Sequence, residues 1–494
     1  MGFISFEFIA MVLVLCAVYY CMPLKYRWIV LFAGSICYYY RCSGALVLLL
    51  AATTLVTWWV GRRIGFTDGA KKENRKAGKF WCTVGILVLL IPLVYVKYAG
   101  FLAGLLHISF STEHIIVPIG ISFYTLQMIA YLVDIYRGKY EAESNVLKFM
   151  LFSMFFPQIL QGPIPRYEAL AGQLWKGHRF EGKEISRAVQ LYVWGCFLKL
   201  VIADKAGIVV DTVFGDTRYY TGVFCLVAGI LYSVQLYTDF LACVCMAKGT
   251  AGMFGIQLGD NFAHPYFADS IKDFWRRWHI SLSSWLRDYI YIPLGGNRKG
   301  KIRRYMNLMI TFLVSGLWHG AGFSYIFWGF LHGFYQIAGE VTQPVRRRIR
   351  ILFGFERLAD QEMNGDLQKG YVWVQRIITF MLVMFGWIIF RAPSLRDGLH
   401  MVRSVFTVPN FWVWFDGSLL QLGLGATEWI VLLIGCGVLL LVSLIQTRIC
   451  IRDRIAECHI LLRWALYAAV ILGIVIFGTY GYGFDANSFI YGGF

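Results

Sequence analysis

Charged residues are scarce in this 494-residue chain: Asp, Glu, Lys and Arg together make up 15% of it, whereas hydrophobic residues make up 58%. A soluble domain of this size does not hide so much apolar surface, so the composition excludes an ordinary soluble protein. Uncharged runs of roughly 18 or more residues recur along the chain and indicate transmembrane helices. The sequence therefore predicts an all-α polytopic membrane protein.

Signals for processing and for metal binding are also missing. The first residues, "MGFISFEFIAMVLVLCAVYYCMPLKYR", have no basic region before the apolar stretch and no small-residue cleavage site, which favours a retained first helix over a signal peptide. Twelve cysteines are scattered, and the closest pair, Cys243 and Cys245, lacks a His or Asp cluster at metal-ligand spacing. We therefore expect no metal site, disulfide framework or redox motif.

The net charge of +17 would suggest nucleic acid in a soluble protein. Here the positive charges lie in short loops between apolar runs, as the positive-inside rule describes for cytoplasmic loops. We therefore expect membrane lipid, and no nucleic acid, as the partner of these charges. The basic loops at 61–79, 346–350 and 448–463 are expected to be cytoplasmic, which places both termini outside.

We expect eleven to thirteen membrane segments, including re-entrant helices. Simple alternation puts the basic stretch 164–187 outside, so one neighbouring segment is expected to re-enter the membrane. The expected spans cover about 5–22, 28–40, 43–60, 80–97, 115–134, 147–163, 188–203, 221–246, 305–318, 321–338, 372–390, 428–446 and 461–478.

Neither an internal repeat nor a low-complexity linker divides the chain, so we expect a single membrane domain over 1–494. Its parts are N-terminal helices (1–110), a core (about 115–340), and C-terminal helices (370–480) followed by an aromatic tail (488–494). A transporter would often show two related halves with matching broken helices. Polarity is instead concentrated in about 255–345, which favours one site.

The polar block "FWRRWHISLSSWLRDYIYIPLGGNR" lies within that region. On a helix over 274–292, aromatic and polar residues step by three and four onto separate faces. Such a helix lies at the interface with its arginines on lipid phosphates, or re-enters the membrane with its polar side toward a cavity. The aromatic face comprises Trp275, Trp278, Leu282, Trp285, Tyr289 and Ile292, and the polar face Arg277, Ser281, Ser284 and Asp288.

No charged residue occurs from Tyr305 to Gly339, a stretch too long for one straight span. Inside it, "SGLWHGAG" (315–322) carries three glycines around Trp318 and His319, which predicts a helix break near mid-membrane. An ionisable residue at that depth is expensive unless it faces a cavity or a partner, so a functional His319 is the working hypothesis. His332 has no glycine break beside it and is expected to be structural.

Together, "WRRWHISLSSWLRDYIYIPLGGNR" and "SGLWHGAGFSYIFWGFLHG" resemble the membrane-bound O-acyltransferase family, in its bacterial alginate O-acetylase branch. "PIGISFYTLQ" (118–127), "QGPIPRYE" (161–168) and "FGIQLGDNFAHPYFA" (254–268) follow in the expected order, so the resemblance covers nearly the whole chain. It implies a ring of tilted helices around a central funnel and tunnel. It also implies acyl transfer to a hydroxyl, with His319 as the catalytic residue and His279 as the second signature position.

The residues themselves suit this chemistry. A neutral histidine can accept the proton of a hydroxyl as it attacks a thioester, and the oxyanion then needs donors from His279, Trp318 or backbone N–H groups. A covalent route through Ser315, on the same helix face as His319, is an alternative. We expect no permanently bound cofactor, because the acyl thioester donor (acetyl-CoA or an acyl-carrier protein) is a substrate.

Further candidates for donor binding or the tunnel come from the polar block and from the matched motifs. The arginines and Asn297 either hold phosphates of the donor or anchor the helix to lipid. Cys245 stands where the family usually has a second aspartate, which puts the donor path or acceptor preference in doubt. The candidates are Arg276, Arg287, Asp288, Tyr289, Asn297, Asp239 and Gln161.

The resemblance implies O-acetylation of a cell-surface polysaccharide by a multi-pass protein of the cell (inner) membrane. It also implies an extracytoplasmic, SGNH-esterase-like partner, toward which the aromatic tail 488–494 passes the acyl group, unless that tail only anchors in the interface. D-alanyl transfer from a carrier protein to teichoic acid is the closest alternative. A lipid-linked glycan transporter and a non-catalytic assembly subunit are alternatives of other classes.

Overall fold

The computed structural model describes residues 1–65, 72–111, 115–159, 161–352, 365–480 and 489. Within these residues every regular element is a helix, which confirms the all-α prediction. The α-helices are α1 (Phe6–Cys21), α2 (Arg27–Ser43), α3 (Val47–Gly65), α4 (Lys72–Leu105), α5 (Ile121–Tyr136), α6 (Val146–Met154), α7 (Phe156–Ile159), α8 (Tyr167–Lys176), α9 (Gly182–Phe197), α10 (Asp204–Gly215), α11 (Val223–Met253), α12 (Ile271–Arg277), α13 (Ile280–Leu286), α14 (Gly300–His319), α15 (Phe323–Val341), α16 (Gln343–Leu352), α17 (Gly365–Arg391), α18 (Leu395–Thr407), α19 (Ala426–Gln446), α20 (Ile451–Glu457) and α21 (Ile460–Phe477).

Six stretches of the described chain are long and apolar enough to cross a membrane, and they make this a multi-pass membrane protein. Two shorter apolar helices, α1 and α5, accompany them. The expected total of eleven to thirteen segments and the ring around a funnel stay predictions. The six stretches are Leu24–Gly65, Arg75–Leu105, Val223–Met253, Gly370–Arg391, Ala426–Gln446 and Ile460–Phe477.

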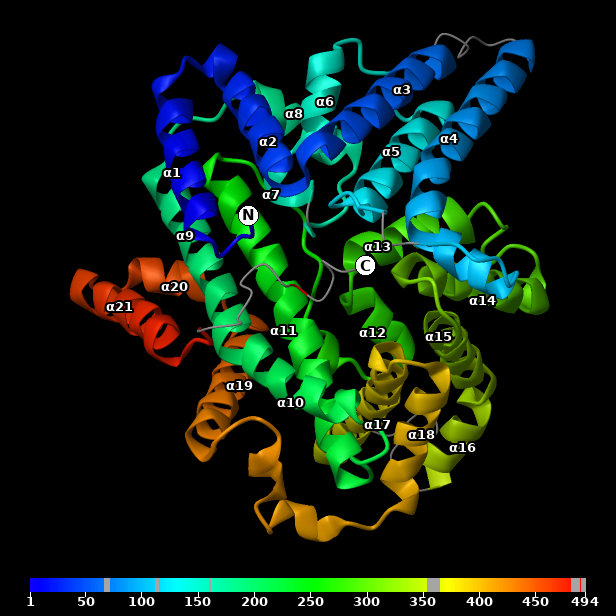
Figure 1. The fold of residues 1–494 in the computed structure, drawn as a ribbon, viewed down its shortest axis with the longest axis vertical. Helices are drawn as coiled ribbons and strands as arrows, with labels where there is room; N and C mark the ends of the chain where they lie inside the picture. Colours follow the sequence, from blue (N-terminus) through cyan, green and yellow to red (C-terminus); the bar gives the residue numbers. More distant parts are fainter. Residues whose placement is uncertain (66–71, 112–114, 160, 353–364, 481–488, 490–494) are drawn as a thin grey trace. The chain divides into compact units, whose positions relative to one another are not determined.

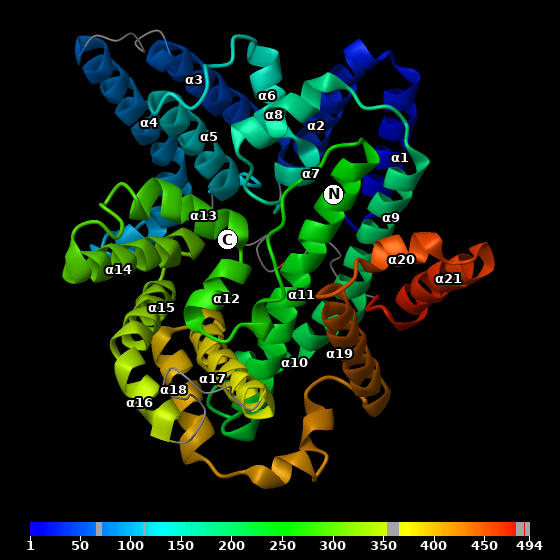
Figure 2. The ribbon, with the colours of Figure 1, turned by 180° about the vertical axis from the view of Figure 1, so that it is seen from behind.

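The chain forms two compact units, each assembled from separate stretches of sequence. The first unit comprises 1–201, 238–260 and 445–494, and in it α3, α4 and α5 pack side by side while α2 lies against α6 (Figure 1). The second comprises 202–237 and 261–444, where α14 and α15 form a tightly packed hairpin and α17 lies against α15 and α18 (Figure 2).

One expected span is wrong, because 147–163 does not form a single helix. Helix α6 ends at Met154, Phe155 leaves the helical conformation, and α7 covers only Phe156–Ile159. Proline at 157 has no N–H to donate and its ring crowds a carbonyl one turn earlier, which favours a break in the helix at this point. The N–H of Phe156 donates instead to the hydroxyl of Ser35 at 3.2 Å.

The hairpin of α14 and α15 owes its close approach to two glycines. A Cβ atom at Gly316 would collide with the backbone oxygen of Tyr325, and one at Gly329 would collide with the backbone oxygen of Phe312. The two helices therefore touch backbone to backbone, as small residues allow in membranes. Helix α14 ends three residues after Gly316, at His319.

Candidate active site

The predicted helix break around "SGLWHGAG" is confirmed. Helix α14 ends at His319, Gly320 and Gly322 are extended, and α15 begins at Phe323. His319 is thus the last helical residue before a turn, and only 3% of it is exposed. The glycines provide the break because they form the tight turn without side chains that would meet the ring of Tyr325.

The single helix expected over 274–292 is wrong, because the chain breaks at His279. That residue takes a left-handed conformation (φ 44°, ψ 54°) between α12 and α13, and a π-helical turn follows over 287–291. A left-handed conformation is uncommon for a residue other than glycine and needs support from its surroundings. Three residues of the aromatic face, Trp275, Trp278 and Trp285, are buried, whereas Ile292 is exposed.

Asn261 supplies the support for that break. Its backbone oxygen accepts from the N–H of Ile280 and its side-chain oxygen accepts from the N–H of Ser281, both at 3.0 Å. These N–H groups belong to the first turn of α13, where a helix leaves its donors without intrahelical partners. Asn261 is 1% exposed and lies in the same unit as His279. It therefore holds the backbone that directly follows the histidine.

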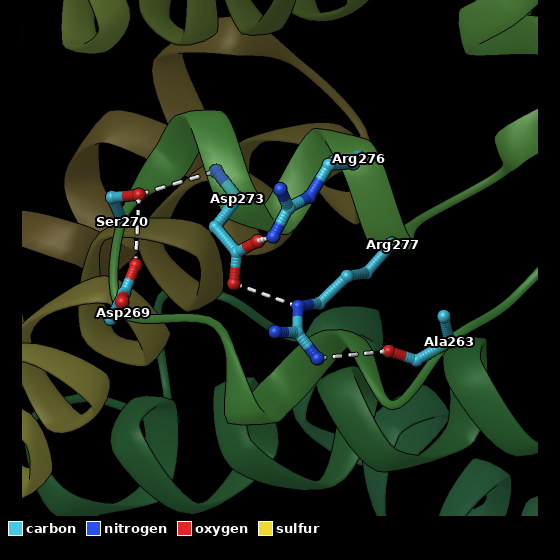
Figure 3. Close-up of polar contacts among 6 residues, drawn as sticks. All are labelled: Ala263, Asp269, Ser270, Asp273, Arg276 and Arg277. Carbon is cyan, nitrogen blue, oxygen red and sulfur yellow. Dashed lines mark hydrogen bonds and ion pairs between the residues drawn. The ribbon is translucent and has the colours of Figure 1, made fainter.

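A cluster of charges ties the preceding helix to the same loop. Ser270 caps α12 by accepting from the N–H of Asp273, and the Asp273 carboxylate accepts from Arg276 and, at 2.7 Å, from Arg277 (Figure 3). Arg277 also donates to the backbone oxygen of Ala263 at 3.3 Å. The cluster thus links α12 to the loop that carries Asn261.

The two candidate histidines both pack against one indole, that of Trp318. The ring of His279 meets Trp318 edge-on with centroids 5.9 Å apart, and Trp318 meets His319 at 4.9 Å. His319 also packs edge-on against Trp328 and Phe390. The structure therefore brings together the two residues that the motifs singled out, within one unit and at nearly full burial.

Ser315 lies one turn before His319 and is 1% exposed, but its hydroxyl has no hydrogen-bond partner among the described residues. A serine nucleophile needs a base within hydrogen-bond reach. The geometry therefore gives no support to the covalent alternative. His332 is fully buried and its Nδ1 accepts from Trp275 Nε1 at 3.1 Å, as suits a structural histidine.

The other candidates in the polar block already have protein partners. Arg276 is mostly exposed and bound to Asp273, and Arg287 pairs with Asp288 at 2.9 Å. Asn297 accepts from the Tyr291 hydroxyl, and Tyr289 packs against Trp285 with centroids 5.1 Å apart. These side chains lie near the turn after α13, and their contacts with the other described residues do not define a common anion-binding position.

Gln161 and Asp239 belong to the first unit. Gln161 is 2% exposed, and its side-chain oxygen has no hydrogen-bond partner among the described residues. Asp239 accepts from Lys199 at 2.7 Å in a buried ion pair, and the Lys199 ammonium lies 4.7 Å above the ring of Phe489. Of the predicted tail 488–494, only Phe489 lies within the described residues.

The first unit also holds a polar cavity of about 700 Å³ beside α9 and α20. Four basic and four acidic side chains line it, so their formal charges cancel, and Arg187 there bridges Glu184 and Asp453. The charge of that carboxylate, Asp453, and then of Glu184, raises the pKa of Arg187. A charge-balanced cavity does not favour an isolated polyphosphate. The charged lining residues are Arg179, Arg187, Lys248, Arg452, Glu181, Glu184, Asp260 and Asp453.

Three residues that the motifs did not single out as functional prove to be structurally important: Asn261, Asp273 and Lys199. Asp273 precedes Arg276 and Arg277 by three and four residues, a helical spacing that is typical of ion pairs and offered a usable signal. Asn261 and Lys199 bind partners that lie 20 and 40 residues further along the sequence. Periodicity within one helix does not reveal contacts over such separations.

The fold and the site define a class: a multi-pass helical membrane protein with two buried histidines at helix ends. The model of the membrane-bound O-acyltransferase family matches residues 142–359, which include both histidines. The probable alginate O-acetylase of Pseudomonas aeruginosa is 37% identical over 80% of this chain and 72% of that protein. The chain belongs to the membrane-bound O-acyltransferase family and is an acyltransferase.

Other relatives act on other polymers according to their names. The peptidoglycan O-acetyltransferase of Helicobacter pylori is 31% identical over 76% of this chain and 73% of that protein. The teichoic acid D-alanyltransferase of Bacillus subtilis is 24% identical over 69% of this chain and 85% of that protein. The family and the reaction class are therefore shared across these relatives, while their polymers differ.

Proposed function

We propose that this protein transfers acetyl groups from a thioester donor for O-acetylation of a cell-surface polysaccharide, with His319 as the general base. The single observation that carries the proposal is that His319 and His279, each at a helix break within the matched region, both pack against Trp318. The relatives named for acetylation of alginate and peptidoglycan support the acetyl group and the polymer acceptor.

The chemistry needs one base and one set of donors. His319 takes the proton of the acceptor hydroxyl as its oxygen attacks the thioester carbonyl, and a carbon–oxygen bond forms. The tetrahedral intermediate then collapses, the carbon–sulfur bond breaks, and the thiolate leaves with the proton that the imidazole carried. We assign His279, whose ring packs against Trp318, to stabilisation of the developing oxyanion by hydrogen bonding.

Substrate access requires movement of the side chains around the histidines. Both rings are nearly sealed, and neither the 700 Å³ cavity of the first unit nor the smaller cavity described below contains either of them. Among the described residues, the rings closest to His319 belong to Trp318, Trp328 and Phe390. We expect these aromatic side chains to rearrange when acceptor and donor bind.

The donor, the partner and the membrane are parts of the proposal. We expect a soluble thioester, acetyl-CoA or an acetylated carrier protein, to deliver the acetyl group from the cytoplasmic side of the cell (inner) membrane. An extracytoplasmic, SGNH-esterase-like protein is expected to complete transfer to the polymer. A purified chain in liposomes that consumes acetyl thioester only when an acceptor hydroxyl is present would support this assignment, and absence of consumption would oppose it.

D-alanyl transfer is the second candidate, and the Bacillus subtilis relative at 24% identity is the observation that favours it. Mass spectrometry of the esters released by mild base from the surface polymer separates the two functions. Cells that carry the gene should gain acetate over cells that lack it. A gain of alanine in place of acetate would establish the second candidate.

A further inference from the structure

The second unit contains an apolar cavity of about 130 Å³ outside the candidate active site. An apolar cavity of about 150 Å³ stays dry and takes up a small hydrocarbon, so this volume suits a short stretch of aliphatic chain and not a whole polar ligand. Its walls come from α11, the short turn 265–267 and α19. The main apolar and aromatic lining residues are Tyr237, Tyr266, Phe267, Cys436, Leu439 and Leu440.

A cation that has no counter-ion among the described residues lies at the edge of that cavity. The guanidinium carbon of Arg376 is 6.0 Å from the centroid of Phe267 and 5.0 Å from that of Trp373. Its Nε has no hydrogen-bond partner, and no carboxylate in the described part of the chain forms an ion pair with it. Arg391 on the same helix differs, because it pairs with Asp211 at 2.6 Å.

Phe267 makes the cavity and the arginine one continuous surface, because its ring lines the cavity and also faces the guanidinium. One turn further along α17, Phe380 packs edge-on against Tyr266 with centroids 5.3 Å apart, and Tyr266 lines the cavity too. The apolar pocket and the positive charge are therefore adjacent within the same unit.

The depth of both features matches the lipid of one leaflet. Arg376 lies six residues inside the candidate span that begins at Gly370, or about 9 Å at 1.5 Å per residue, within reach of headgroups for a long side chain. Cys436 and Ser443 line the cavity from the last half of the span that ends at Gln446. The basic stretch 448–463 directly follows the span that ends at Gln446, and the basic stretch 346–350 precedes the span that begins at Gly370 with no apolar run of membrane-spanning length between them. The sequence predicts both stretches to be cytoplasmic.

We propose that this surface is a binding site for a phospholipid of the cytoplasmic leaflet. The phosphodiester accepts hydrogen bonds from Arg376, and a stretch of one acyl chain fills the cavity between Phe267 and α19. Charge complementarity selects a phosphate-bearing lipid, because an arginine in an apolar span is costly without an anion. The site does not depend on the proposed acetyl transfer.

Photo-crosslinking tests the site directly on the full chain in detergent. The probe is a phosphatidylglycerol with a diazirine in one acyl chain, and crosslinked peptides are mapped by mass spectrometry. We expect labelling of 264–267 or 436–443 well above that of the exposed helix α21. Arg376→Gln should lower this labelling about tenfold, as loss of a charged hydrogen bond allows. Arg403→Gln, which removes an equal charge from an exposed position on α18, should leave it unchanged.

A second variant and a second probe separate the two parts of the site. Cys436→Phe fills the cavity and should also lower labelling, with gel filtration reporting whether each variant remains monodisperse. An alkyl maltoside with the same diazirine chain but no phosphate should label the site no more than it labels α21. Inorganic phosphate should not displace the lipid probe, because it has no chain for the cavity.

Several results would overturn the proposal. Equal labelling of the wild-type chain by the phospholipid and the maltoside probe would show that the phosphate does not contribute to binding. This comparison does not depend on the folding of any variant. Labelling spread evenly over the exposed helices would show that the cavity is not a specific site for the acyl chain. Displacement by inorganic phosphate alone would make the site an anion site and not a lipid site.

Discussion

The side-chain oxygen of Asn261 accepts a hydrogen bond from the backbone N–H of Ser281 at 3.0 Å, two residues after His279. The same asparagine accepts from Ile280 through its backbone oxygen. The left-handed histidine is thus held by a residue from the preceding loop, and not by the helix in which it was predicted to lie. This contact makes Asn261 a positioning residue for His279 and leads to the first prediction.

Asn261→Leu should reduce acetyl transfer about tenfold or more, because the first turn of α13 loses its cap and His279 loses its fixed backbone. Loss of a helix cap costs about 0.5–2 kcal/mol, so the folded protein should remain. Asn261→Asp keeps an acceptor at the same place and should retain most of the activity. If both variants lose activity equally while remaining folded, the cap is not what positions His279.

Gly316→Ala should destabilise the α14–α15 hairpin by about 1–3 kcal/mol or more, because the new methyl group meets the backbone of Tyr325. Thermal unfolding in detergent, followed by gel filtration, measures the change. Gly322→Ala is the matched control, since its Cβ would lie 3.5 Å from the Tyr325 ring and its backbone is extended. An unchanged unfolding temperature in Gly316→Ala would contradict the close crossing.

Trp275→Phe should cost about 1–3 kcal/mol of stability beyond packing, because it leaves the Nδ1 acceptor of buried His332 without its donor. Trp328→Phe is the comparison, since Trp328 Nε1 has no hydrogen-bond partner among the described residues. Trp328→Phe should therefore lose only packing contacts. The unfolding temperatures of the two variants measure the difference. Equal losses of stability in Trp275→Phe and Trp328→Phe would mean that the hydrogen bond to His332 contributes nothing measurable.

Asp239→Leu should destabilise the protein by about 3–5 kcal/mol, because it removes the carboxylate that pairs with the buried Lys199 ammonium. The double variant Asp239→Leu with Lys199→Met should recover most of that stability. Activity then separates two roles for Asp239. Recovery of acetyl transfer in the double variant indicates a structural ion pair, whereas a stable but inactive double variant indicates that the tunnel needs the carboxylate.

Parts of this architecture could be predicted from sequence, and the reasons are physical. The break after His319 was predictable because glycines 316, 320 and 322 mark it locally. The break at His279 was not, since the aromatic period over 274–292 continues through it and the capping residue comes from a distant loop. The 3.6-residue period placed Trp275, Trp278 and Trp285 on one face, and the structure shows that all three are buried.

The polar candidates show a second limit of pattern reading. Arg276 and Arg287 were candidates because of their charge, but in the structure they form ion pairs with Asp273 and Asp288. The pair of Lys199 and Asp239 joins residues 40 positions apart, which no local spacing reveals. The motifs therefore located the histidines, whereas the tertiary structure identified what holds the surrounding residues in place.

The most direct test of the account is the acetyl ester content of surface polysaccharide in cells that carry His319→Ala at wild-type protein level. The account predicts loss of essentially all acetate that depends on this gene. His400→Ala, which removes an exposed histidine on α18, should leave the ester content unchanged. Wild-type acetate in cells with His319→Ala would contradict the assignment of this imidazole as the base.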